Sequence, residues 1–244
     1  MRYAIISDIH SNLEALRAVL DGLADTKVDA TCCLGDVVGY NANPNECIDI
    51  LRTEGIHCLM GNHDSRAAGL EEPDDFNPAA ARAILWTREQ LTPENRRFLH
   101  GLPREIRVDG LVLVHGSLHD TDRYILTVND VQDNFRALRE LEPPARIGFF
   151  GHTHVRIVFT LSNRSILIEQ NENIRITDDR SYLINPGSVG QPRDGDPRAA
   201  FAVYDSDTSE ISFHRVEYDI RVCQDKIIRA GLPPRLAERL AIGR

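Results

Sequence analysis

Residue types that bind metal ions and transfer protons are concentrated in five short segments of this 244-residue sequence. The segments are Asp8-Ile9-His10, Gly35-Asp36, Gly61-Asn62-His63-Asp64, His115-Gly116 and Gly151-His152-Thr153-His154. Each segment follows an apolar run that we predict to be a β-strand. Ligands of open α/β sheets bind beyond the carboxyl ends of the strands. Five such ends of one sheet would bring these side chains to one place.

Taken singly, each segment has a purely structural explanation. Asp-x-His and Gly-Asp are common in turns, and Asn, Asp and Gly tolerate the left-handed backbone that turns require. A lone histidine such as His115 after an apolar run is usually structural. His152 and His154 are two residues apart and would point the same way in an extended segment, which favours a metal site. The hypothesis of a shared metal site rests on the joint occurrence of all five segments at strand ends.

These residue types fit two metal ions better than one. The candidate metal ligands are Asp8, His10, Asp36, Asn62, His115, His152 and His154. Seven ligands are too many for one catalytic ion with an open position, whereas a bridging carboxylate divides them between two ions. Imidazole with carboxylate favours Mn, with Fe, Zn, Co or Ni as alternatives, over Mg. The two carboxylates leave the pair of divalent ions positively charged, so a phosphate oxygen and a hydroxide could bind there.

His63 and Asp64 are the candidate catalytic residues. His63 follows the candidate ligand Asn62, so it should lie at the edge of the metal cluster. We expect it to hydrogen-bond the phosphoryl or leaving-group oxygen, as a general acid or a charge stabiliser. We expect Asp64 to orient that imidazole. A turn histidine and a turn aspartate are the structural alternatives.

The elements that must position these residues begin with alternating strands and helices. Strands are predicted over Tyr3–Ile6, Val28–Leu34 and Ile56–Met60. The form Ser11-Asn12-Leu13-Glu14 indicates a capping box that opens the first helix. Asn43-Pro44 begins the second helix, which Gly55 ends. This β-α-β-α-β order favours a parallel sheet covered by helices.

The rest of the chain is predicted to mix helices with many strands. Helices are expected within residues 64–103, centred on Pro78–Leu91 and Pro93–Leu99, then over Asn129–Leu141, and over Ile220–Leu240 with a break at Pro233-Pro234. Asp109-Gly110 predicts a hairpin between Ile106–Val108 and Leu111–Val114. Further strands are expected at Arg146–Phe150, Ile157–Leu161, Ser165–Glu169, Tyr182–Ile184, Ala200–Tyr204 and Ile211–Val216.

Composition excludes several classes of function. The formal net charge is -9 and the sequence pI is near 5.5, so we expect no stable binding to a nucleic-acid polymer. No apolar stretch is long enough for a membrane span or a signal peptide, and we expect a cytoplasmic protein without a membrane partner. The five cysteines lack CxxC spacing, which favours reduced, buried thiols.

The five segments, in this order, resemble the calcineurin-like metallophosphoesterase superfamily. Residues Asn185-Pro186-Gly187-Ser188-Val189-Gly190 also resemble a stretch of its small bacterial and archaeal phosphodiesterase-type members. The resemblance implies an α/β fold, a four-layer α/β/β/α sandwich, over a single domain of residues 1–244. It implies one metal at Asp8, His10, Asp36 and His154. It implies a second at Asp36, Asn62, His115 and His152, with Asp36 bridging and His63 catalytic.

One departure from the superfamily bears on the substrate. Its phosphoprotein phosphatases carry Gly-Asp-x-x-Asp-Arg-Gly, whereas this chain has Gly35-Asp36-Val37-Val38-Gly39-Tyr40-Asn41. An arginine is the natural clamp for a phosphomonoester dianion. Its absence favours a phosphodiesterase acting on a small nucleotide-like phosphate ester. The alternatives are a phosphomonoesterase or protein phosphatase, a catalytically silent scaffold, and a nuclease.

Several positions have no assigned role at this stage. Arg193 could replace the missing clamp, and Asn12 and His119 could approach the substrate, although each also suits a structural role. Residues 118–131 follow a metal-ligand motif without clear periodicity and form either a specificity loop or a plain surface loop. The sequence is compatible with a homo-oligomer and does not identify one.

Overall fold

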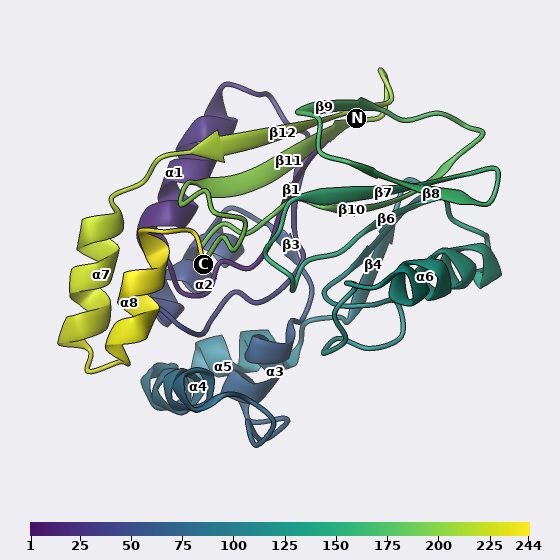
Figure 1. Ribbon diagram of the computed structural model, residues 1–244. Coiled ribbons are helices and arrows are strands. Elements are labelled where there is room, and N and C mark those ends of the chain that lie inside the picture. Colours follow the sequence, from purple (N-terminus) through teal and green to yellow (C-terminus); the bar gives the residue numbers. More distant parts are fainter.

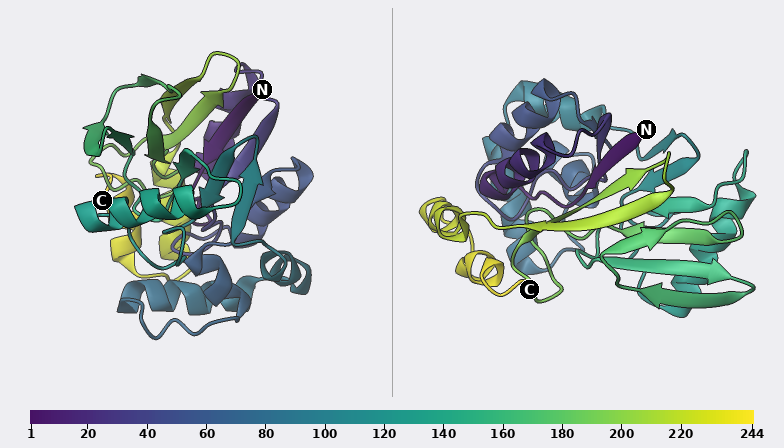
Figure 2. Two further views of the ribbon diagram at one scale, coloured as in Figure 1. Left: turned by 90° about the vertical axis from the view of Figure 1, so that its right-hand side faces the viewer. Right: turned by 90° about the horizontal axis from the view of Figure 1, so that it is seen from above.

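Two six-stranded sheets pack against each other in the computed structural model, which describes residues 1–244. Helices cover the outer face of each sheet, and Figure 1 shows α1 and α2 beside one sheet and α6 beside the other. Seen from above in Figure 2, the two sheets lie as separate layers between these helices. The predicted four-layer α/β/β/α sandwich is confirmed.

The first sheet has the strand order β3-β2-β1-β11-β12-β9. Its strands are β1 (Arg2–Ile6), β2 (Ala30–Cys33), β3 (His57–Cys58), β9 (Asn173–Arg175), β11 (Ala199–Asp205) and β12 (Glu210–Val216). The first three strands are parallel, as the β-α-β-α-β pattern predicts. β11 and β12 then extend the sheet in antiparallel fashion. β9 was not predicted, because three residues carry too little periodicity.

The second sheet has the order β4-β5-β6-β10-β7-β8. Its strands are β4 (Glu105–Val108), β5 (Leu111–Val114), β6 (Ile147–Phe149), β7 (Ile157–Ser162), β8 (Ser165–Glu169) and β10 (Ser181–Asn185). β5, β6 and β10 are parallel, and the other neighbours are antiparallel. The predicted hairpin joins β4 to β5, and both Asp109 and Gly110 have positive φ at the turn.

Eight helices complete the fold. They are α1 (Leu13–Ala24), α2 (Pro44–Thr53), α3 (Asn62–Ala68), α4 (Pro78–Gln90), α5 (Pro93–His100), α6 (Val128–Glu140), α7 (Ile220–Arg229) and α8 (Pro234–Leu240). The predicted break at Pro233-Pro234 separates α7 from α8. None of these helices has both the length and the apolar character needed to cross a membrane.

The alternation of side chains along β1 explains the layers. Ala4 and Ile6 belong to the core beneath α1 and α2, whereas Tyr3 and Ile5 belong to the core between the sheets. Successive side chains of a strand point to opposite faces, so one short strand contributes to both cores. A third core lies between the second sheet and α6, where Phe135 is buried.

The first helix is capped differently from the prediction. Asn12, not Ser11, is the N-cap, and its side-chain oxygen accepts a hydrogen bond from the Ala15 amide at 3.1 Å. The Ser11 hydroxyl instead accepts from the Gly39 amide at 3.2 Å. The capping-box prediction was therefore wrong by one residue. Asn12 is itself a favoured capping residue, and the sequence pattern did not separate the two.

The expectation that one sheet supplies all five candidate segments was also wrong. Segments after β1, β2 and β3 come from the first sheet, and segments after β5 and β6 come from the second. The sheets are joined at this edge by hydrogen bonds from the His152 amide to both carboxylate oxygens of Asp8, each at 3.2 Å. Strand pairing is a long-range property that a local apolar run does not reveal.

Removal of a large side chain between the sheets should destabilise the whole sandwich. Phe149 on β6 is 0% exposed and lies in the core between the sheets. We expect Phe149→Ala to lower the free energy of unfolding by about 3–5 kcal/mol, because it leaves a cavity. Urea titrations followed by circular dichroism would measure this. Ile168→Ala on β8, where the side chain is 63% exposed, is the control and should change stability by less than about 0.5 kcal/mol. Equal effects would contradict the layer assignment.

Candidate metal centre

The structure brings the seven predicted ligand residues to one edge of the sandwich. Asp8, His10, Asp36 and His154 form one group whose ligand atoms all lie within 4.8 Å of one another. Asp36, His115 and His152 form a second such group. Asn62 joins the second group, since its Oδ1 lies 3.1 Å from His115 Nε2. Asp36 is common to both groups, which is the arrangement that a bridging carboxylate requires.

Backbone carbonyl groups fix the orientation of the histidine rings. Nδ1 of His10, His115 and His154 lies 3.1, 2.8 and 2.6 Å from the carbonyl oxygens of Val38, Leu34 and Gln191. A carbonyl oxygen accepts only, so each Nδ1 carries a proton, and each Nε2 faces the cluster and presents a lone pair whenever the ring is neutral. His152 is held the other way, with Nε2 lying 3.1 Å from the Asp122 carbonyl oxygen. Its Nδ1 is the free ligand atom.

This orientation creates close contacts between acceptor atoms. Nε2 of His10 and Nε2 of His154 are 3.1 Å apart, and neither carries a proton when the rings are neutral. Asp8 Oδ1 is 3.4 Å from the same His154 nitrogen. Lone pairs in such a buried cluster repel one another unless a cation lies among them. The donor set therefore fits a metal ion that accepts from all of these atoms.

The second group has the same character. His115 Nε2 lies 3.2 Å from Asp36 Oδ2, while its Nδ1 already donates to Leu34. Burial lowers the pKa of His115, but the Asp36 carboxylate outweighs burial and raises that pKa to about 10. A proton on Nε2 thus occupies the place that a metal ion would take. The other effect of His115 is to hold the pKa of Asp36 well below its usual range, against its burial.

The remaining histidines stay neutral, which is the state that binds metals. Burial lowers the pKa values of His10 and His154 well below the ordinary value of histidine. Burial also lowers the pKa of His152 to about 3. Burial, together with the neighbouring Asp36, raises the pKa of Asp8 to about 6. Two carboxylates held this close compete for ionisation, and divalent cations would relieve that competition.

The backbone of the site is strained at the candidate ligands. Positive φ angles occur at five of the seven: 55° at Asp8, 49° at His10, 54° at Asp36, 63° at His152 and 59° at His154. Such conformations cost non-glycine residues about 1–3 kcal/mol each and cluster at functional sites. His152 and His154 are accordingly not extended, and they serve different groups, so the expectation that they point the same way was wrong.

Two glycines permit the close approach of the loops. A Cβ at Gly61 would lie 2.1 Å from Asp36 Oδ1, and one at Gly151 would lie 2.1 Å from Ser7 Oγ. The Gly61 and Gly151 backbones therefore pack directly against the acidic residues, which explains the glycines in these motifs.

The segment Asn185–Gly190 makes hydrogen bonds to the loops that carry the candidate ligands. The Asn185 amide donates to the Gly151 carbonyl at 2.7 Å and to Thr153 Oγ1 at 3.0 Å. The Ser188 hydroxyl donates to the Asp8 carbonyl at 2.8 Å. Asn12 donates to the Gly190 carbonyl at 2.9 Å. Both polar atoms of the Asn12 side chain thus make structural contacts, and this segment connects loops of both sheets.

His63 lies at the edge of the cluster, as expected. Its amide donates to Asp36 Oδ1 at 2.8 Å, and its ring packs between the rings of Tyr40 and Phe76, with centroid separations of 4.5 and 4.7 Å. Nδ1 of His63 is buried without a hydrogen-bond partner. Burial lowers the pKa of this imidazole to about 4. His63 is therefore neutral at physiological pH.

Asp64 does not make the expected contact with His63. Its two carboxylate oxygens accept from the Gly61 amide at 3.0 Å and the Val38 amide at 3.1 Å. It caps α3 and ties that helix to the loop after β2. The position of Asp64 directly after His63 suggested a pair, but neighbouring residues at a helix start point in different directions.

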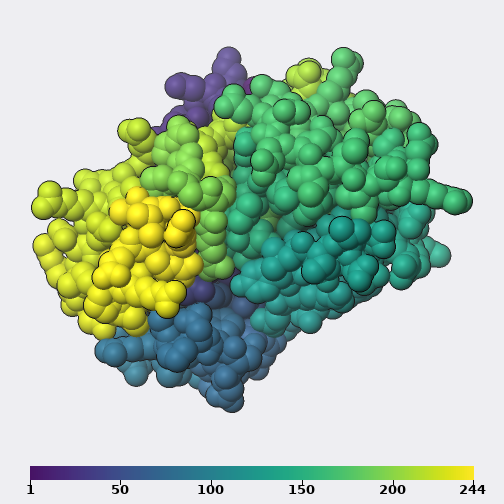
Figure 3. Space-filling model, in the orientation of Figure 1, coloured from purple at the N-terminus to yellow at the C-terminus, as the bar shows by residue number.

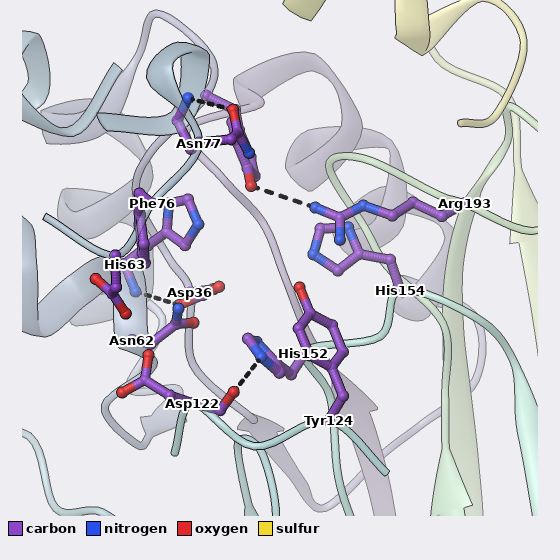
Figure 4. Close-up of a pocket in the computed structure, with 13 residues that line it drawn as sticks. Asp36, Asn62, His63, Phe76, Asn77, Asp122, Tyr124, His152, His154 and Arg193 are labelled. Atoms are coloured by element: carbon purple, nitrogen blue, oxygen red, sulfur yellow. Dashed lines mark hydrogen bonds between the residues drawn. The ribbon is translucent and has the colours of Figure 1, made fainter. Parts of the chain in front are cut away.

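A cavity of about 180 Å³ opens over the cluster (Figure 4). Besides metal-site residues and His63, its lining includes Tyr40, Asp75, Phe76, Asn77, Ala80, Asp122, Tyr124 and Arg193. Tyr124 stacks on His152 with a centroid separation of 3.9 Å, so residues 118–131 contribute to the site. Sequence reasoning missed Tyr124 and Phe76, whose loops carry no motif. His119 is exposed and absent from the lining.

The buried neutral state of His63 makes stability depend on pH. The unfolded chain binds this proton below pH about 6.5, whereas the folded chain binds it only near its pKa of about 4. The stability from this group is thus complete above pH 6.5 and lost as pH falls towards 4. His63→Asn removes this contribution. We expect the stability of wild type relative to the variant to fall by about 1.4 kcal/mol per pH unit within this window. Urea titrations at several pH values in the presence of chelator would test this. Free energies of unfolding that change with pH in the same way for wild type and variant would contradict it.

Comparison with known proteins agrees with this geometry. The family model for the calcineurin-like phosphoesterase superfamily domain matches residues 1–209. An uncharacterized protein of Methanocaldococcus jannaschii is 40% identical over 245 residues, covering 99% of this chain and 98% of that protein. The crystal structure of a metallophosphoesterase from Sphaerobacter thermophilus is 40% identical, with a TM-score of 0.86 over 100% of this chain and 99% of that one. A hypothetical protein from Pyrococcus horikoshii shares the fold, with 21% identity and a TM-score of 0.81 over 100% and 98% of the two chains. The chain belongs to the calcineurin-like phosphoesterase superfamily, as its sequence motifs predict.

Proposed function

We propose that this protein is a metal-dependent phosphodiesterase that hydrolyses a small, nucleotide-like phosphate ester. The observation that carries the proposal is the pair of ligand groups that share Asp36 and open into one cavity beside His63. When bound, two divalent ions would supply a water nucleophile at neutral pH and stabilise negative charge on the phosphoryl group.

In this proposal the chain divides its ligands between the two ions. One ion is held by Asp8, His10, Asp36 and His154. The other is held by Asp36, Asn62, His115 and His152. Manganese suits this mixture of imidazole, carboxylate and amide ligands, and Fe, Zn, Co and Ni are its competitors.

His63 would stabilise charge on the reacting group rather than give up a proton first. Because burial lowers its pKa to about 4, the ring is neutral at pH 7 and donates a hydrogen bond through one nitrogen. It would hold the phosphoryl or leaving-group oxygen as negative charge develops there. Asp64 is then a positioning residue that fixes the start of α3, on which His63 lies.

The charges around the cavity favour a diester over a monoester. The position of the missing arginine is occupied by Tyr40, and burial raises the pKa of that phenol, so it is neutral. Arg193 is the one lysine or arginine among the lining residues, and Asp75 and Asp122 also line the cavity. A phosphodiester has one negative charge and needs less compensation than a monoester dianion. A neutral Tyr40 and a single guanidinium therefore suit the diester.

Activity on synthetic substrates tests this proposal. We expect the manganese-loaded protein to hydrolyse an aryl phosphodiester faster than the matching aryl monoester or a phosphopeptide, and chelator to abolish turnover. His63→Ala should lower kcat by roughly 10²–10⁴-fold, while His119→Ala, an exposed histidine, serves as the control. Faster monoester or phosphopeptide turnover would reverse the specificity. Unchanged turnover in chelator would remove the proposal.

Metal content tests the ligand assignment separately from activity. We expect Asp36→Asn to lower binding at both ions, since it serves both groups, whereas His154→Ala or His152→Ala should affect one ion each. Loss of one ligand typically weakens binding by at least about 10-fold. Elemental analysis after dialysis against manganese would measure the stoichiometry. Full occupancy of both ions in Asp36→Asn would contradict the shared carboxylate.

A further inference from the structure

A second, larger cavity lies directly beside the one over the metal centre. Its volume is about 770 Å³, and it shares Tyr40, Asn77, Tyr124 and Arg193 with the first cavity. Its outer wall comes from α8 and the residues that follow this helix. Figure 3 shows this yellow C-terminal segment against the blue segment that contains α4. A molecule bound at the metal centre could extend into this space without leaving the protein.

The second cavity is rich in arginine. Arg193, Arg235, Arg239 and Arg244 line it, and Glu238 is the one acidic residue among the lining residues. The chain as a whole has a net charge of -9. A local excess of positive charge in an acidic protein marks a site for an anion, because uncompensated like charges otherwise repel one another.

These guanidinium groups have no Asp or Glu partner in the protein. Nearby arginines outside the cavity are paired, Arg198 with Asp196 and Arg215 with Asp194. The four cavity arginines make no ion pair with an Asp or Glu side chain, and Nε of Arg239 donates a hydrogen bond to the main-chain oxygen of Arg244 at 2.6 Å. Arg193 donates to the Tyr40 hydroxyl at 3.3 Å and to Gln191 Oε1 at 3.1 Å, but its Nε is buried without a partner. Burial, followed by repulsion from Arg193, lowers the pKa of Arg239.

We propose that this arginine-lined cavity binds a second phosphate group of the substrate, next to the phosphate that reacts at the metal centre. The inference rests on the proposed function and narrows its substrate class. The substrate would be a nucleotide-like compound with a chain of two or more phosphates, in which the reacting phosphate has two bridging oxygens. Arg193 lines both cavities and would contact the chain where it passes from one to the other.

Guanidinium groups are well suited to bind phosphate. Each presents a planar fork of donors that matches two phosphate oxygens. In the reaction, oxygen from water forms a bond to phosphorus, a proton of that water is released to solvent, and the bond from phosphorus to the bridging oxygen of the leaving group breaks. The electron pair stays on that oxygen, and the arginines of α8 would hold the phosphate that departs with it.

Binding of inorganic phosphates tests the cavity without metal or turnover. In calorimetry on the full-length, metal-free protein, we expect tripolyphosphate to bind at least about tenfold more tightly than monophosphate. The double variant Arg235→Ala/Arg239→Ala should lose roughly tenfold or more of the tripolyphosphate affinity. Arg136→Ala, which removes an exposed arginine from α6, is the matched control and should bind as wild type does. Circular dichroism would establish that each variant is folded.

The possible outcomes separate this inference from the proposed function. Equal affinity for tripolyphosphate and monophosphate, or equal losses in the double variant and in Arg136→Ala, would overturn the inference. Selective loss in the double variant supports it even if the manganese-loaded protein fails to cleave aryl diesters, in which case the proposed function alone falls. With manganese, the kcat/KM ratio of a dinucleoside triphosphate to the aryl diester should also fall about tenfold in the double variant.

Discussion

Repulsion among buried acceptor atoms around Asp36 is the constraint on which the rest of this site depends. The fold places His10 Nε2 and His154 Nε2 3.1 Å apart. Nδ1 of each ring donates its proton in a hydrogen bond to a backbone carbonyl. Such an arrangement is unfavourable in a protein that has only protons to place there, because burial disfavours imidazolium. A cation shared by these atoms would convert the same contacts into favourable ones, so the donor set fits a metal ion.

The sandwich must hold this unfavourable cluster together. Backbone strain at Asp8, Asp36 and His152 adds about 1–3 kcal/mol for each residue. The large apolar cores on both faces of each sheet offset that cost, and the buried hydrogen bonds of Asn185 and Ser188 lock the loops of the two sheets to each other. In a flexible scaffold the carboxylate oxygens and imidazole nitrogens would move apart, and the geometry that metal binding requires would be lost.

Local patterns in the sequence predicted the strands, the motif positions and the convergence of Asp8 with Asp36, because each depends on a short stretch of chain. They did not predict that His115 and His152 come from a second sheet, since strand pairing is set by contacts far apart in the sequence. They also misplaced Asp64, whose carboxylate caps a helix rather than touching the neighbouring imidazole. Tyr124 was missed altogether, because nothing in its loop marks a residue that stacks on a ligand.

Selection of a substrate depends on charge at two distances from the reacting phosphorus. Close to it, two cations opposed by Asp8 and Asp36 would leave a moderate positive charge, and neutral Tyr40 adds none, which suits a phosphate that already carries two ester-type bonds. Farther out, Arg235 and Arg239 add positive charge that no Asp or Glu side chain pairs with. A monoanion without further phosphates would interact only with the positive charge at the metal centre. A longer phosphate chain would interact with the metal centre and with these arginines. The arginines would add affinity without changing the chemistry at the metal centre.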